Sequence, residues 1–369
     1  MVTGRVALLF DKRLLARMTH GRRVVLVSGT NGKTTTSALV RAGWGPGVAG
    51  NESGSNMTAG LVGSLAQHHL DRIVLEVDEA YLAKILEDTN ADVVVLLNLS
   101  RDQLDRASEV RMLAERWREA LAGTSATVVA NAADPLVAHA VARVDSVVWC
   151  DVSTPWRHDA VACPSCTAPL TFSDLGWSCS CGLRQPVATW RQERDELSGP
   201  MASIQLGMGI PGAFNRANAA IAIAALVEIG VDPSVALSRI AQVTDVAGRF
   251  SHRTLLGQNV TLALAKNPAG FAALLDEVES TTGPLWIAIN ARVADGLDPS
   301  WLYDAPFERL RGRTVFCFGD RRLDLATRLE MAGVNAVVVT DKAPAAHDGR
   351  IWALANYTAF AEWLRESRG

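Results

Sequence analysis

The chain has 369 residues, of which 49% are hydrophobic and 20% are charged, and its formal net charge is −3. This length exceeds one ordinary hydrophobic core and predicts two domains. The slightly acidic balance argues against a protein whose main task is to hold nucleic acid or an anionic membrane surface.

The N-terminal sequence MVTGRVALLFDKR does not predict a secretory leader. Charged residues follow the short apolar run at once, and no small-residue cleavage site comes after it. No apolar run reaches the roughly 20 residues that span a bilayer. We therefore expect a cytoplasmic chain, which would meet any lipid-linked substrate at the inner face of the membrane.

A glycine-rich loop follows the first apolar run, in the sequence VVLVSGTNGKTTT. Val24 to Val27 predict a buried strand, after which Gly29 and Gly32 allow a tight turn with its backbone N–H groups pointing inward. Lys33 and Thr34 then open a helix. Backbone N–H groups, a helix N-terminus and an ammonium group converge where nucleotide phosphates bind, and a Thr34 hydroxyl can ligand Mg²⁺. An ordinary glycine-rich turn would not explain the Lys-Thr pair.

Carboxylates end the next predicted strand, residues 72–77. Glu76 lies inside the apolar run, while Asp78 and Glu79 follow it. Acidic residues at the carboxyl end of a strand can hold Mg²⁺ beside phosphates. A solvated pair of loop acids is the alternative, and it suits Asp78 and Glu79 better than Glu76.

Further apolar strands alternate with helices along this half of the chain. Strands are predicted at residues 92–97 and within 126–135, with a helix at 110–121 between them. This alternation predicts a parallel sheet covered on both faces, with ligands beyond the carboxyl ends of its strands. The glycine-rich segment 43–60 is either a loop that lines the cleft or a plain connection.

Four of the six cysteines cluster between residues 153 and 200, in a segment that interrupts the α/β pattern. Clustering in a cytoplasmic protein favours metal binding over disulfides. The cysteines form two pairs with twelve residues between the pairs, a spacing typical of the two halves of a tetrahedral zinc ribbon. The second pair has one residue between its cysteines instead of the preferred two. One alternative is a ribbon that has lost or loosened its metal. A redox-active cysteine pair is a weaker alternative, because the four cysteines occur as two spaced pairs and not as one. The zinc ligands would be Cys163, Cys166, Cys179 and Cys181.

The α/β pattern resumes at residue 209 and continues to the C-terminus. An alanine-rich helix begins near Asn215 and Asn218, which would either cap it or reach the nucleotide base. A second α/β domain is predicted from about Ala247 to a last helix at 357–365.

These motifs together resemble those of the Mur ligases and folylpolyglutamate synthases. The shared features are GTNGKTTT, the strand-terminal Glu76, NAADP and GAFNRANAA. More narrowly, four features resemble the MurT family: NLSRDQLDR, with Gln103 where most Mur ligases have histidine, the cysteine-rich insertion, KNPAGF from Lys266, and ADGLDPSW. A Mur ligase ordinarily also has an N-terminal domain for a UDP-sugar, and the early phosphate loop leaves no room for one, which fits a lipid-linked substrate.

The resemblance implies a fold and a domain plan. Residues 1–246 would form a Mur ligase-type central ATPase domain, a mostly parallel sheet with helices on both faces and a four-cysteine zinc-ribbon insertion at about 153–200. Residues 247–369 would form a second, Rossmann-like α/β domain that docks a glutaminase.

The resemblance also implies a reaction. With ATP and Mg²⁺, the D-glutamate α-carboxyl of the lipid II stem peptide would become an acyl phosphate, which ammonia would convert to D-isoglutamine. The zinc would be structural. The residues implied at the nucleotide are Gly29, Thr30, Asn31, Gly32, Lys33, Thr34, Thr35, Asn215, Asn218 and Arg249, with Thr34 and Glu76 as magnesium ligands and Lys33 and Glu76 in catalytic roles.

The sequence shows no nucleophile-elbow motif for releasing ammonia, and the resemblance implies that a partner supplies it. Cys150 and Cys317 lie in apolar, strand-like runs and are expected in the core. By resemblance the partner is a GatD-like glutaminase, whose cysteine and histidine need an aspartate from this chain. Asp298 is favoured over Asp295 because it lies in the DxSW part of the motif. A helix N-cap before Pro299 is the alternative role for Asp298, and both roles are compatible.

Two other classes of function compete with this one. The first is a ligase of the same fold that adds an amino acid to a carboxylate, which Gln103 and the KNP motif argue against. The second is a non-catalytic nucleotide-binding zinc-ribbon protein. Such a scaffold would not need Lys33, Thr34 and Glu76 together, and no Arg/Lys stripe indicates nucleic acid.

Overall fold

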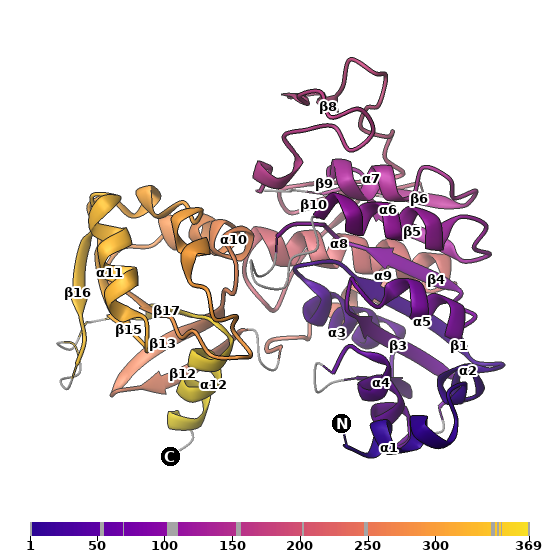
Figure 1. The fold of residues 1–369 in the computed structure, drawn as a ribbon, viewed down its shortest axis with the longest axis horizontal. Helices are drawn as coiled ribbons and strands as arrows, with labels where there is room; N and C mark the ends of the chain where they lie inside the picture. The colour runs from indigo at the N-terminus through magenta and orange to yellow at the C-terminus, as the bar shows by residue number, and fades with distance from the viewer. Residues whose placement is uncertain are drawn as a thin grey trace. The chain divides into compact units, whose positions relative to one another are not determined.

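The computed structural model divides the chain into two compact units. The first runs to Ser100 and continues from Ser108 to Thr244, and the second contains the chain from Asp245 onward. The structure describes residues 2–51, 55–68, 70–101, 110–152, 156–200, 203–246, 250–340, 344, 347 and 349–367. The two units are described separately (Figure 1).

The first unit is built on a nine-stranded sheet of order β11-β10-β9-β6-β5-β4-β1-β3-β2. Its strands from β6 to β2 are parallel, and β9 joins β6 in parallel before an antiparallel edge formed by β10 and β11. The bounds are β1 Arg23–Ser28, β2 Val48–Gly50, β3 Arg72–Val77, β4 Val93–Leu96, β5 Thr127–Asn131, β6 Val147–Asp151, β9 Trp190–Glu193, β10 Glu196–Ser198 and β11 Ser203–Gln205.

Helices cover both faces of this sheet, as parallel strands require. The contacts place α3, α8 and α9 together on one face, and α5, α6 and α7 together on the other (Figure 1). The bounds are α1 Val2–Phe10, α2 Leu14–Thr19, α3 Lys33–Trp44, α4 Thr58–Leu65, α5 Leu82–Asp88, α6 Val110–Leu121, α7 Pro135–Ala140, α8 Ala213–Glu228 and α9 Pro233–Ile240.

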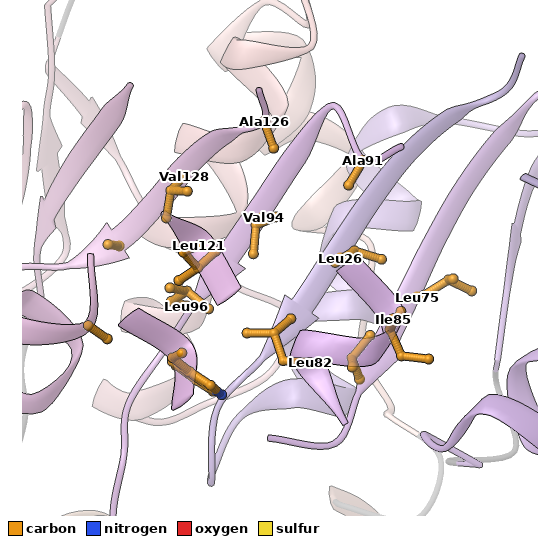
Figure 2. Packing of buried hydrophobic residues seen from close by; sticks show 14 of the residues in the cluster. Leu26, Leu75, Leu82, Ile85, Ala91, Val94, Leu96, Leu121, Ala126 and Val128 are labelled. Carbon is orange, nitrogen blue, oxygen red and sulfur yellow. The ribbon is translucent and has the colours of Figure 1, made fainter. Parts of the chain in front are cut away.

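The main core of this unit lies on the α5–α6 face. Alternate residues of each strand point there, as the two-residue period of a strand dictates. Leu26, Val94 and Leu96 from the strands lie opposite Leu82 and Leu121 from the helices (Figure 2). The intervening strand residues are equally buried on the α3–α8 face, so both faces are apolar and the predicted parallel sheet is confirmed.

Two local predictions for this unit were incomplete. The glycine-rich segment 43–60 is not one loop, because it contains β2 and the start of α4. The cysteine-rich segment 153–200 is not wholly separate, because β9 and β10 extend the main sheet. These two strands are short and largely polar, and Trp190 and Leu197 are their buried residues. They therefore lack the run of apolar residues that would have predicted a strand of the main sheet. The separate part contains a small hairpin, β7 Thr171–Ser173 and β8 Gly176–Ser178.

The second unit has a six-stranded sheet of order β12-β13-β17-β14-β15-β16, parallel except for the hairpin of β12 and β13. The strand β17 lies between β13 and β14, so the strand order reverses beside β14 and the loops after β14 and β17 meet at the carboxyl edge. The bounds are β12 Phe250–Leu255, β13 Gln258–Leu264, β14 Leu285–Ala288, β15 Thr314–Phe318, β16 Asn335–Val338, β17 Ile351–Ala355, α10 Pro268–Glu279, α11 Arg322–Met331 and α12 Tyr357–Glu366.

Aromatic side chains fill the core of the second unit on both faces of its sheet. Trp286, Phe360 and Trp363 form one cluster with α12. On the other face, the ring of Phe271 on α10 lies 5.6 Å from that of Trp301 and 5.4 Å from that of Phe307. The predicted second α/β layer structure is therefore present. No helix within the described ranges of the chain is long and apolar enough to cross a membrane.

Candidate active site

The phosphate loop connects β1 to α3, and its two glycines have backbone angles that other residues rarely adopt. Gly29 has φ +143° and Gly32 has φ +88°. A Cβ atom at Gly29 would lie 2.9 Å from Leu97 Cβ, and one at Gly32 would lie 2.6 Å from Asn218 Oδ1. The turn therefore requires glycine at both positions, as the sequence predicts.

Lys33 opens α3 with its ammonium group folded back over the loop. Its Nζ donates to the Gly29 carbonyl at 2.5 Å and lies 2.6 Å from Glu79 Oε2. Only 5% of the Lys33 side chain and 11% of the Glu79 side chain are exposed. The alternative that Glu79 is a solvated loop acid is therefore wrong, because its carboxylate is the main charge partner of the loop lysine.

The loop after β4 clamps the phosphate loop from its other side. Asn98 Oδ1 accepts the Asn31 N–H at 2.9 Å, and Thr30 Oγ1 donates to the Ser100 carbonyl at 3.0 Å. The Asn98 carbonyl also accepts the Thr30 N–H. Neither Asn98 nor Ser100 was predicted as a site residue. Their position directly after a buried strand, where ligands bind in parallel sheets, was the available signal.

Glu76 is buried at the carboxyl end of β3, with 3% of its surface exposed. The Asn51 side chain bridges its backbone, accepting the Glu76 N–H and donating to its carbonyl, both at 2.8 Å. Asn56 Nδ2 lies 3.5 Å from Glu76 Oε1. The glycine-rich segment thus lies beside this carboxylate, as expected for a loop that lines the cleft, and Thr34 is half-buried at the start of α3.

Asn215 and Asn218 both lie on α8, and neither caps it, because the N-cap residue is Gly212. Asn218 instead touches the phosphate loop, as the short approach of its Oδ1 to the Gly32 position shows. This residue is 9% exposed and Asn215 is 2% exposed. Of the other predicted positions, Arg249 and Gln103 lie outside the described residues.

Asp134, in the NAADP motif, joins α7 to the loop that clamps the phosphate site. One carboxylate oxygen accepts the Leu136 and Val137 N–H groups, and the other accepts the Leu99 N–H at 2.9 Å. Burial raises the pKa of Asp134 to about 6, against the lowering effect of these three donors. The side chain is therefore both a helix cap and the anchor of residues 97–100.

Replacing Asp134 with alanine should destabilise the first unit by about 2–4 kcal/mol, because a cap is lost and the buried Leu99 N–H loses its acceptor. Urea unfolding measures the change. Asp232→Ala is the matched control, since Asp232 caps α9 with the same two hydrogen bonds but is exposed. We expect about 1 kcal/mol for the control. Equal losses in the two variants would show that the Leu99 contact contributes nothing.

The four clustered cysteines converge in space. All four Sγ atoms lie within 4.8 Å of one another, with Cys163 and Cys181 at 3.7 Å and Cys166 and Cys179 at 3.4 Å. The Cys181 N–H lowers the pKa of the Cys179 thiol to about 6, assisted by the hydrogen bond from Cys166. Burial raises the pKa of the Cys163 thiol, and hydrogen bonds to the neighbouring cysteines raise that of Cys166, so the shift at Cys179 alone favours the thiolate that a metal requires.

Two side chains attach this cysteine cluster to the main sheet. Trp177, 3% exposed, donates from Nε1 to the Ala132 carbonyl at 3.0 Å. His139 on α7 lies 3.0 Å from Ser165 Oγ through Nδ1 and 2.7 Å from Glu115 Oε1 through Nε2. Anchored this way, the cluster is a part of the first unit and not an independent module.

The remaining two cysteines are core residues, as predicted. Cys150 and Cys317 are fully buried on β6 and β15, and burial raises the pKa of each thiol. A buried thiol with a raised pKa is a poor nucleophile.

In the second unit, the two candidate aspartates have different environments. Asp295 is 3% exposed, and its carboxylate accepts the Thr358 N–H at 2.8 Å, the Thr358 hydroxyl and, at 3.3 Å, the Arg292 N–H. It therefore ties the loop after β14 to the start of α12.

Asp298 is exposed in the same loop. One of its carboxylate oxygens accepts the Ser300 N–H at 2.8 Å, and this bond lowers the pKa of the carboxyl. The expected helix N-cap role of Asp298 is wrong, because the N-cap of the short helix Ser300–Tyr303 is Pro299 and no side chain caps it. Asp298 instead stabilises this turn through its bond to the Ser300 N–H. Asp298 is thus exposed to solvent, whereas Asp295 is buried.

Comparisons with known proteins agree with this architecture. A family model described as Mur ligase middle domain matches residues 27–154, and one described as MurT ligase C-terminal matches residues 264–360. The MurT subunit of lipid II isoglutaminyl synthase from Staphylococcus aureus is 27% identical over 98% of this chain and 91% of its own length. Its counterpart from Streptococcus pneumoniae is 29% identical over 92% of this chain and 83% of its own length.

A solved structure shows the same fold at low sequence identity. A pseudomurein peptide ligase type C from Methanothermus fervidus superposes with a TM-score of 0.71 at 19% identity, covering 94% of this chain and 78% of its own. The fold and the phosphate loop define a Mur ligase-type synthetase. The chain is therefore similar to the Mur ligases over residues 27–154, to MurT ligases over residues 264–360, and to the MurT subunits over nearly its whole length.

Proposed function

We propose that this chain amidates the D-glutamate α-carboxyl of the lipid II stem peptide to D-isoglutamine, using ATP. The carboxylate attacks the γ-phosphorus to give an acyl phosphate and ADP. Ammonia then attacks the acyl carbon, phosphate leaves, and the nitrogen loses a proton. Phosphorylation is needed because a free carboxylate is a poor electrophile. The relatives from Staphylococcus aureus and Streptococcus pneumoniae, named as MurT subunits of this synthase, support the proposal.

The observation that carries the proposal is the buried Lys33 ammonium group at a complete glycine loop. Residues 29–35 would surround the phosphates, with Asn218 beside Gly32 and Asn215 toward the base. Arg249 is proposed as a further nucleotide contact. In our assignment, residues 1–246 form the ATPase domain and 247–369 the domain that docks a GatD-like glutaminase.

Magnesium would be held by the Thr34 hydroxyl and the Glu76 carboxylate, whose hard oxygen atoms suit this ion. Bound there, Mg²⁺ would neutralise charge on the transferring phosphoryl group. The two hydrogen bonds from the Asn51 side chain to the Glu76 backbone would hold the Glu76 carboxylate in position for the ion.

Structural zinc is proposed at Cys163, Cys166, Cys179 and Cys181, where four sulfur atoms lie close enough to share one tetrahedral ion. We expect one zinc per chain by mass spectrometry and a fall in Tm of several degrees on chelation, since a metal that binds only the folded state stabilises it. Cys163→Ser should lose the metal. Cys150→Ala, outside the cluster, should keep it, and a chain purified with less than a tenth of an equivalent of zinc would refute the site.

We expect the reaction at the inner face of the membrane. It is tested by co-purifying the chain with a GatD-like glutaminase and measuring ATP-dependent amidation of lipid II. Glutamine and free ammonia should each support product formation. An alternative is a ligase that adds an amino acid. ATP turnover driven by an added amino acid, with no amidated lipid II from either nitrogen source, would replace our assignment with that alternative.

A further inference from the structure

The N-terminal helix α1 has two apolar stripes, and only one of them faces the protein. Gly4, Ala7 and Leu8 face inward, at the spacing of one helix face. A Cβ atom at Gly4 would lie 1.8 Å from the Ala59 carbonyl oxygen, so α1 lies directly against α4. Ala7 and Leu8 pack on the main core of the first unit. This stripe explains why α1 is held in place.

The second stripe points to solvent. Val6, Leu9 and Phe10 repeat the same helical spacing on the outer face, and their exposed fractions are 47%, 81% and 88%. Single exposed apolar side chains are common, but three on one helix face form a patch. Core packing does not explain this patch. Figure 1 shows α1 at an edge of the first unit, with α4 on its inner side.

Exposed basic side chains also occur in α1 and in the segment that follows it. They are Arg5 on α1, Lys12 and Arg13 in the connection to α2, and Arg17 on α2. Arg17 pairs with Asp11 and remains 68% exposed. Residues 2–20 contain four basic side chains and this one acidic side chain, a formal charge of +3, whereas the whole chain carries −3, so the remaining residues carry −6.

We propose that this basic apolar face, Arg5, Val6, Leu9, Phe10, Lys12, Arg13 and Arg17, binds the surface of an anionic lipid bilayer. Large apolar side chains can enter the boundary between headgroups and acyl chains, while Lys and Arg side chains nearby in the same segment pair with lipid phosphates. The positive charge of this segment complements an anionic surface, which would repel the acidic remainder of the chain. This local charge differs from the net charge of −3, which argues only against a protein whose main task is to hold an anionic surface.

The chemistry of the face favours lipid over nucleic acid. Contacts to nucleic acid phosphates need the basic groups but give no reason for Leu9 and Phe10 to be exposed together. A bilayer uses both kinds of group at once. The face is a property of the chain whatever reaction it catalyses, but under the proposed function it would hold the enzyme at the membrane that contains its lipid-linked substrate.

The test is sedimentation of the full chain with vesicles of phosphatidylcholine alone or with about 30% phosphatidylglycerol. We expect binding to the anionic vesicles only. Leu9→Ser with Phe10→Ser, and separately Lys12→Glu with Arg13→Glu, should each weaken this binding about tenfold or more. The matched controls are Leu175→Ser with Leu323→Ser, which removes two exposed apolar side chains elsewhere, and Arg116→Glu with Arg143→Glu, which makes the same change of charge.

Each outcome decides the proposal. Absence of binding to anionic vesicles, or binding that both pairs of substitutions leave unchanged, would overturn it. Equal competition by duplex DNA, insensitive to the loss of Leu9 and Phe10, would show a general polyanion site instead. Amidation is assayed in parallel on detergent-solubilised lipid II. Product without vesicle binding refutes this inference alone, whereas vesicle binding without product refutes the proposed reaction alone.

Discussion

Lys33→Met should reduce ATP-dependent amidation by about 10²–10³-fold, and by the same factor with glutamine or free ammonia as nitrogen source. The ammonium group lies at the turn where the γ-phosphate would be transferred, and no neutral side chain can balance the charge that develops there. Because phosphorylation precedes the nitrogen step, the choice of nitrogen source cannot rescue the variant. Steady-state phosphate release and product formation measure the effect.

A loss of folding must be separated from this loss of catalysis. The substitution leaves the Glu79 carboxylate, 11% exposed, without its ammonium partner 2.6 Å away. A buried charge without its partner is costly, so Lys33→Met should also lower the stability of the first unit. Lys33→Met with Glu79→Gln removes both charges. This double variant should regain much of the stability and none of the activity.

The double variant therefore decides what Lys33 does. Activity that returns together with stability would show that Lys33 only neutralises Glu79. Glu79→Gln alone leaves the ammonium group in place and should retain nucleotide binding. If Glu79→Gln lost activity as completely as Lys33→Met, with unchanged stability, the carboxylate would have a role of its own in the reaction.

The sequence predicted the layers and the phosphate loop well because both depend on local pattern. Val24 to Val27 are apolar on both faces of their strand, and the Gly32-Lys33-Thr34 order allows few structures other than a turn into a helix. The helix at 110–121 and the strand at 72–77 have the predicted bounds.

Contacts that join distant segments were not predictable in this way. For Glu79 the sequence left open a magnesium ligand or a solvated loop acid, and neither reading predicts that the fold brings its carboxylate to Lys33, 46 residues earlier in the chain. Asn98 and Ser100 contact a loop almost 70 residues away. A single sequence contains the pattern of each element but not the pairing of side chains across the carboxyl edge of the sheet.

The two aspartates of the DGLD segment show the same limit. Sequence favoured Asp298 over Asp295 by its place in the motif, without a physical reason. The fold adds a physical difference between them, because Asp295 is buried and bonded to Thr358 and Arg292 while Asp298 is exposed. The role of Asp298 stays a prediction. Thr358 is 63 residues further along the chain, so its contact with Asp295 could not be read from local pattern.

Asp298→Asn should abolish glutamine-driven amidation, with a loss approaching 10⁴-fold, and leave ammonia-driven amidation within about twofold. An aspartate that orients a catalytic histidine contributes about this factor, and asparagine has nearly the same shape. The exposed side chain bonds to Ser300 within its own turn, so the fold should tolerate the change. Glutaminase activity of the co-purified pair, product formation with each nitrogen source, and complex formation by gel filtration measure the outcome.

Asp295→Asn should behave differently from Asp298→Asn. The asparagine NH₂ group would face the N–H donors of Thr358 or Arg292, so these donors would lose their acceptor. The substitution should lower the stability of the second unit by about 1–3 kcal/mol. Asp324→Asn, an exposed aspartate on α11, controls for loss of charge. Loss of glutamine-driven activity in Asp295→Asn at full stability, with Asp298→Asn unaffected, would transfer the role to Asp295. Equal loss with both nitrogen sources in Asp298→Asn would place that residue in the synthetase reaction itself.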